Sequence, residues 1–182
     1  LVSQLDVLET MTPAEFLSFR KFLESSSGFQ SAQFRELEFL LGQKRPKMME
    51  YHDQGSSGRQ RLEQRLVEPS LWDAFLNCLS QNNINIPQKL LERDFTQADT
   101  ASPEVQLELI EVYKNTPLLA HLCELLVDFD EGLQEWRYRH VKMVERTIGT
   151  KRGTGDSQGA EYLKKTLFQP VFPDLWEIRA EL

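Results

Sequence analysis

Apolar residues along this chain recur every three to four positions, which is the spacing of one face of an α-helix. The longest such run follows Pro117 and comprises Leu118, Leu122, Leu125, Phe129, Leu133, Trp136, His140, Val144 and Ile148. It predicts one helix from Pro117 to about Ile148 with these positions facing inward. At ~1.5 Å per residue this helix spans on the order of 45 Å, long enough for the centre of a helical bundle.

Capping residues and the same spacing predict several shorter helices. Thr12, Pro13 and Glu15 have the pattern of a capping box and start a helix that extends to about Leu23. A second amphipathic helix ends at Gly42 and forms a helical hairpin with the first. A further helix is predicted after Ser70, with Leu71, Trp72, Phe75, Leu76 and Leu79 in helical register. Others are predicted around Leu62 and Leu66, from Pro103 to about Asn115, and after Ala160 and Pro173.

Strand patterns are scarce, because no segment alternates apolar and polar residues between turn residues. We therefore expect an all-α helical bundle with one long central helix, and a single domain over residues 1–182. The stretch 43–58 contains Pro46 and a Gly-Ser turn, and we interpret it as a loop rather than a domain boundary. Leu1–Leu8 has the pattern of a helix interior without an initiator Met or signal sequence, so we expect a further N-terminal portion in the natural protein.

The composition argues against a nucleic-acid-binding protein and against a membrane-spanning one. With 182 residues, 40% hydrophobic, the chain can form one sizeable core. The formal net charge of −7 argues against a nucleic-acid surface, and charges break every apolar run well short of a membrane span. Cys78 and Cys123 have no metal-ligand spacing, which favours a reducing compartment. The expectation is a soluble cytoplasmic protein without nucleic-acid or membrane partners.

His140 lies on the face that the periodicity predicts to be buried. An imidazole there is either a hydrogen-bonded core residue or a ligand. As a ligand it suits a single axial bond to haem iron, which needs one neutral imidazole on a rigid helix. His52 and His121 have no second ligand at suitable spacing.

Arg20 shares a predicted helix face with Phe16, four residues earlier. A guanidinium beside an apolar wall suits a small carboxylate with a hydrophobic side chain, because the planar fork can bind both carboxylate oxygens. The alternative is an ordinary surface arginine that pairs with Glu24 or extends into solvent.

The glycine-rich loop 149–159 lacks the spacing of a phosphate-binding loop and follows a helix rather than a strand. Two interpretations remain open for it. It is either a flexible lid beside the end of the helix that carries His140, or a plain connector.

Four segments, in this order and at similar separations, together resemble the tryptophan 2,3-dioxygenase family. They are Met11–Arg20, Ser26–Ser31, Trp136–His140 and Lys151–Gly155. The resemblance implies an all-helical fold of the tryptophan/indoleamine 2,3-dioxygenase type and a homotetramer. It further implies a b-type haem with ferrous iron, and O2 as the co-substrate that is inserted into the indole ring of L-tryptophan. The product would be N-formylkynurenine, in the first step of the kynurenine pathway.

Carried over by position, the resemblance makes His140 the proximal ligand of the haem iron and Arg20 the partner of the tryptophan carboxylate. Phe16 would form a wall of the indole pocket, and Thr154 would contact the substrate ammonium group. Ser27 and Gly28 would line the haem edge.

The chain also departs from the family pattern. Asp156 and Gln158 stand where the family loop has glycine and small residues, and the family's N-terminal segment with its distal histidine has no counterpart in these residues. The departures in the loop leave room for a relative that oxygenates a modified tryptophan or another aromatic amino acid. A non-catalytic helical interaction domain is the alternative of another class.

Overall fold

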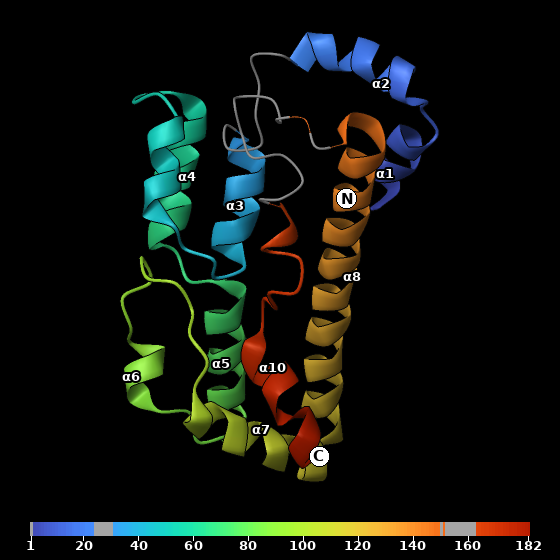
Figure 1. Ribbon diagram of the computed structural model, residues 1–182. Coiled ribbons are helices and arrows are strands. Elements are labelled where there is room, and N and C mark those ends of the chain that lie inside the picture. Colours follow the sequence, from blue (N-terminus) through green and yellow to red (C-terminus); the bar gives the residue numbers. More distant parts are fainter. Residues whose placement is uncertain (1, 24–30, 150, 152–162) are drawn as a thin grey trace. The chain divides into compact units, whose positions relative to one another are not determined.

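The computed structural model describes residues 2–23, 31–149, 151 and 163–182 (Figure 1). Over these residues its regular elements are helices, without a strand, which confirms the all-α prediction. The chain divides into two compact units, one formed by residues 1–28 and 128–170 and the other by residues 29–127 and 171–182. The long helix α8, Pro117–Ile148, belongs to both, and each unit is described by itself below.

The first unit contains α1 (Val2–Glu9), α2 (Pro13–Arg20), the 3-10 turn η1 (Lys21–Leu23) and α8 from residue 128 onward. The predicted capping box is present at the start of α2. Thr12 Oγ1 accepts from the Glu15 backbone N–H at 3.3 Å, and a Glu15 carboxylate oxygen accepts from the Thr12 backbone N–H at 2.8 Å. α2 therefore begins where the sequence predicted, although none of its side chains is buried.

The second unit contains most of the helices. They are α3 (Ala32–Leu40), η3 (Pro46–Tyr51), α4 (Ser57–Val67), α5 (Leu71–Gln81), α6 (Gln88–Leu91), α7 (Pro103–Asn115), the beginning of α8, α10 (Pro173–Glu177) and η5 (Ile178–Glu181). The predicted boundaries of α5 and α7 are confirmed, and so is the Ser70 capping box.

The core of the second unit joins its C-terminal segment to α5 and α7 (Figure 1). The Trp72 ring stacks on Phe172 with 5.7 Å between ring centroids. A carboxylate oxygen of buried Asp174 accepts from the Ser102 backbone N–H and from Gln106 Nε2, each at 2.8 Å. Asp174 thereby supplies the acceptor that the N-terminus of α7 needs, since the Ser102 side chain makes no capping bond.

Two predictions about the second unit were incomplete. The stretch 43–58 is not all loop, because it contains η3 and the first residues of α4, which is an 11-residue helix. The helix that packs against α3 is α4, whose Arg61 forms an ion pair with Glu36 of α3 at 2.5 Å. α2 belongs to the other unit, so the expected hairpin of α2 and α3 stays a prediction.

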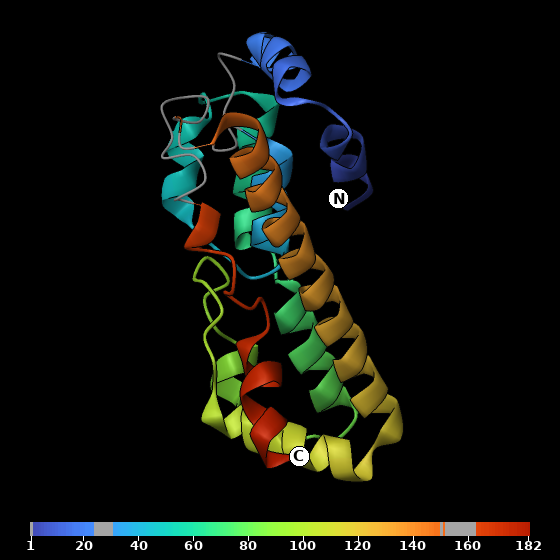
Figure 2. The ribbon, with the colours of Figure 1, turned by 45° about the vertical axis from the view of Figure 1, so that its right-hand side comes forward.

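The bounds of α8, which Figure 2 shows as one continuous helix, agree with the prediction, but the predicted buried face is confirmed only in part. Leu118, Leu125 and Phe129 are 80%, 50% and 43% exposed. Two positions of the predicted face, Leu133 and Ile148, are buried. The other buried positions are Leu119, Cys123, Leu126, Val127, Asp130, Val141, Met143 and Thr147. The helix is apolar on two adjoining faces, and tertiary contacts decide which of them is covered.

The predicted helix after Ala160 falls largely outside the described residues, whereas the one after Pro173 is α10. No helix in the described parts of the chain combines the length and the apolar character that crossing a membrane would require.

Candidate functional site

His140 lies in the last third of α8 and is half-buried, with buried Val141 beside it in the sequence. Its ring is 5.2 Å from that of Trp136, one helical turn earlier, at an interplanar angle of 35°. Burial lowers the pKa of His140, so the imidazole is neutral at neutral pH. Within the described residues, no hydrogen bond joins this ring to another group.

These properties fit an axial ligand of haem iron. A neutral imidazole keeps a lone pair on one nitrogen, and haem iron requires just one such protein ligand on its proximal side. The helix backbone fixes the position of the residue, and the Trp136 ring lies beside the imidazole. The chemistry of His140 therefore agrees with the cofactor that the sequence predicted.

Arg139, the residue before His140, connects α8 to α1. Its Nε donates to Glu9 Oε1 at 3.0 Å and its Nη2 donates to Glu9 Oε2 at 2.7 Å. Nη2 also pairs with Asp6, one turn earlier on α1. These bonds raise the pKa of Arg139 and lower that of Glu9, so both groups stay charged. Sequence reasoning missed this contact, because nothing in the Trp136–His140 run indicates a partner 130 residues away.

Arg137 makes a comparable connection on the other side of the run. Its Nη1 donates to the backbone oxygens of Thr166 at 3.3 Å and Gln169 at 2.5 Å. The segment that follows residues 152–162 is thereby attached to the same part of α8.

Arg20 is the last residue of α2, and Phe16 precedes it by one turn. Both side chains are partly buried, and the Phe16 ring lies 6.3 Å from that of Phe19. α2, α1 and the His140 end of α8 belong to the same unit, and the ion pairs of Arg139 join α1 to α8. Glu24, the alternative partner of Arg20, lies outside the described residues.

The remaining predicted site residues cannot be placed. Ser27, Gly28 and Thr154 lie outside the described residues, and so do Asp156 and Gln158 of the glycine-rich loop. Their roles stay predictions from the sequence, as do the roles of Phe16, Arg20 and His140 toward substrate and cofactor.

Comparison with known proteins gives a consistent result. The family model described as tryptophan 2,3-dioxygenase matches residues 1–81 and 106–182. A tryptophan 2,3-dioxygenase of Herpetosiphon aurantiacus is 59% identical over all 182 residues, which cover 69% of that relative. Relatives of the same name from Anaeromyxobacter sp. strain K and Caulobacter vibrioides are 50% and 44% identical over 100% and 97% of this chain, each with 68% of its own length covered.

Proposed function

Because this chain belongs to the tryptophan 2,3-dioxygenase family and is an oxidoreductase of the dioxygenase type, we propose that it oxidises L-tryptophan to N-formylkynurenine with a haem held by His140. The observation that carries the cofactor assignment is the state of His140. It is a neutral imidazole on a rigid helix, and no described residue occupies its ring nitrogens with a hydrogen bond. The shared name of the relatives favours tryptophan itself over a modified tryptophan, and an enzyme over a non-catalytic helical domain.

The protein groups supply binding and orientation, while haem b with ferrous iron would supply the activation of O2. His140 would hold the iron through a ring nitrogen. The lowered pKa of His140 matters for this role, because a protonated imidazole has no lone pair to offer.

Arg20 would bind the carboxylate of tryptophan through its planar guanidinium, and Phe16 would provide an apolar wall for the indole ring. Thr154 would hold the ammonium group, while Ser27 and Gly28 would border the haem. These two contacts with the amino-acid end would bind the substrate and set the direction in which its indole ring points.

We also propose the family's homotetramer as the assembled form. The exposed apolar residues Leu118, Leu125 and Phe129 of α8 provide apolar surface that association would cover. Two free cysteines, with Cys123 buried, agree with a reducing compartment such as the cytoplasm.

Haem titration of the purified protein tests the proposed function. We expect a Soret band that saturates at one haem per chain, and formation of N-formylkynurenine from L-tryptophan under reducing conditions. His140→Ala should abolish the Soret band, whereas the matched variant His121→Ala, at an exposed position earlier on α8, should retain it. A full-strength haem spectrum in His140→Ala would show that the ligand assignment is wrong.

A further inference from the structure

Arg139, in the Trp136–His140 run, forms ion pairs with two residues of α1, Asp6 and Glu9. Its guanidinium contacts both oxygens of Glu9 and also pairs with Asp6. A forked contact of this kind fixes orientation as well as distance, which a single ammonium group cannot do. The turn of α8 that carries His140 is therefore held to α1 at a defined angle.

α1 is a short helix of eight residues. Its Leu5 is buried, but Val7 is 63% exposed. An eight-residue helix is marginal by itself in water, so its placement depends on its tertiary contacts. The Arg139 ion pairs and the burial of Leu5 are two contacts that help to fix it.

The connection from α1 to α2 is short and internally bonded. Thr10 Oγ1 donates to the Val7 carbonyl oxygen at 2.7 Å, and the Met11 backbone N–H donates to the Leu8 carbonyl oxygen at 3.2 Å. Thr12 then caps α2. A displacement of α1 is consequently transmitted to α2 rather than absorbed between them. None of the α2 side chains is buried.

We infer that Arg139 is a positioning residue for the substrate site: by holding α1 to the His140 turn of α8, it sets the place of Arg20 and Phe16 on α2 relative to His140. The inference rests on the proposed function, since it assigns Arg20 to the substrate and His140 to the cofactor. Asp6 and Glu9 are then its two partners in this role. A purely structural surface ion pair would have no such effect, because exposed pairs contribute little to stability.

Arg139→Gln and Glu9→Gln, singly and together, test this inference. We expect amide hydrogen exchange in residues 13–20 to rise roughly tenfold in each variant, while residues 133–148 stay protected. In the haem-loaded enzyme the Soret band should be unchanged and the KM for tryptophan should rise about tenfold or more. The double variant should be no worse than Arg139→Gln alone, because Arg139→Gln already removes the contact with Glu9.

Two further variants serve as controls. Lys142→Gln removes an ion pair with Glu145 that lies within α8, at 2.9 Å, and should leave exchange in α2 and the KM unchanged. Arg139→Lys keeps the charge but not the fork, so it should restore part of the lost exchange protection and part of the KM.

Unchanged exchange in residues 13–20, additive effects in the double variant, or loss of the Soret band in Arg139→Gln would each overturn the inference. A wild-type protein that binds no haem would instead contradict the proposed function. The exchange comparison does not depend on haem, so it still decides whether Arg139 positions α2.

Discussion

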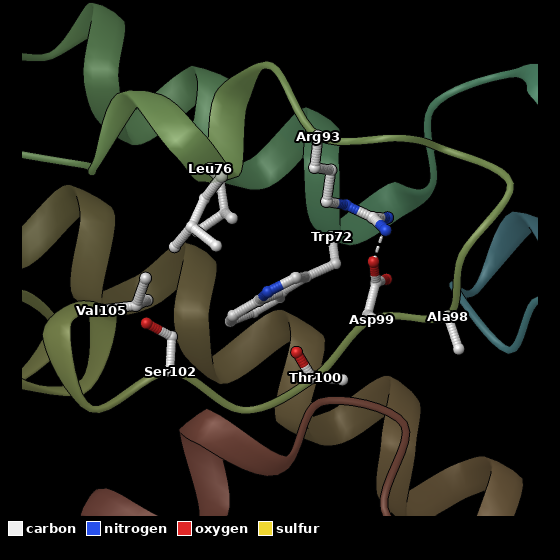
Figure 3. Close-up of a pocket in the computed structure, with 9 residues that line it drawn as sticks. Trp72, Leu76, Arg93, Ala98, Asp99, Thr100, Ser102 and Val105 are labelled. Carbon is white, nitrogen blue, oxygen red and sulfur yellow. Dashed lines mark hydrogen bonds and ion pairs between the residues drawn. The ribbon is translucent and has the colours of Figure 1, made fainter.

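Arg93 and Asp73 form a bidentate ion pair in the second unit: Nε donates to Oδ1 at 2.6 Å, and Nη2 donates to Oδ2 at 2.8 Å. The same guanidinium pairs with Asp99, whose carboxylate accepts from Ser70 Oγ at 2.9 Å. Figure 3 shows Arg93 and Asp99 facing one another beside Trp72, at the edge of a small pocket. This network holds the segment after α6 against the N-terminus of α5.

Replacement of Arg93 by Gln should destabilise the chain by about 3 kcal/mol or more. Asp73 has 1% of its side-chain surface exposed, and removal of its partner leaves a buried charge unpaired. Lys89→Gln is the matched control, because its ion pair with Glu104 is exposed on both sides and should contribute less than about 1 kcal/mol. Urea unfolding of the two variants checks this, and equal midpoints would contradict it.

The stability of the chain should depend on pH through Asp99. Burial raises the pKa of Asp99 from 3.8 to about 6. The negative charge of Asp73 raises this pKa too, whereas the positive charges of Arg93 and Lys44 lower it. The folded chain therefore takes up a proton at Asp99 at a higher pH than the unfolded chain does. This group favours the folded state most below about pH 4, and the contribution is lost as the pH rises through about 6.

Asp99→Asn removes this titration and leaves that of Asp73 in place. Asp73 acts with the opposite sign, since its pKa is lowered and its contribution is lost on acidification. Relative to Asp99→Asn, the wild-type chain should gain roughly 2 kcal/mol between pH 7 and pH 4, which is most of the ~3 kcal/mol that corresponds to a pKa change from 3.8 to about 6. Urea midpoints across this range measure the gain, and parallel pH profiles would refute the role of Asp99.

Gly42 is predicted to be intolerant of alanine for a steric reason. Its φ is +83°, and a Cβ at this position would overlap the Asp99 carboxylate. The Asp99 backbone N–H also donates to the Gly42 carbonyl oxygen at 3.0 Å, so the two segments cannot separate without losing a bond. We expect Gly42→Ala to cost about 3 kcal/mol or more.

Gly55 provides the control for Gly42. It has nearly the same φ, +81°, but a Cβ there would meet nothing within 4 Å. Gly55→Ala should therefore cost only the backbone strain, on the order of 1 kcal/mol. Thermal unfolding of both variants separates strain from overlap, and similar losses would show that the overlap with Asp99 relaxes without cost.

The sequence predicts helix boundaries well where local chemistry sets them. The capping boxes at Thr12 and Ser70 and the proline at the start of α7 determine where a helix begins, so α2, α5 and α7 were located correctly. The length of α8 follows in the same way from an unbroken period of 3.6 residues.

Tertiary contacts were not predictable in this way. Leu125 and Phe129 have the same hydropathy as their buried neighbours on α8, and no local signal tells which face a neighbouring element covers. The partners of Arg139 and Arg93 lie 130 and 20 residues away, and charge alone cannot select them. The candidate site was thus predictable in the residues that resemble a family, but not in the ion pairs that hold those residues.

Arg20 should control the affinity for tryptophan rather than the chemical step. Its proposed contact is with the substrate carboxylate, which does not change during oxidation of the indole ring, so ground state and transition state lose the same binding energy. Arg20→Gln should therefore raise the KM for tryptophan about ten- to a hundredfold with little change in kcat, because charged hydrogen bonds of this kind contribute about 1.5–3 kcal/mol.

Arg20→Lys should recover only part of the affinity, since an ammonium cannot bind both oxygens in parallel. Lys21→Gln, the exposed neighbour, serves as the control for a general loss of positive charge. Steady-state kinetics with tryptophan and with tryptamine, which lacks the carboxylate, decide the matter: a variant equally impaired toward both substrates would place Arg20 elsewhere.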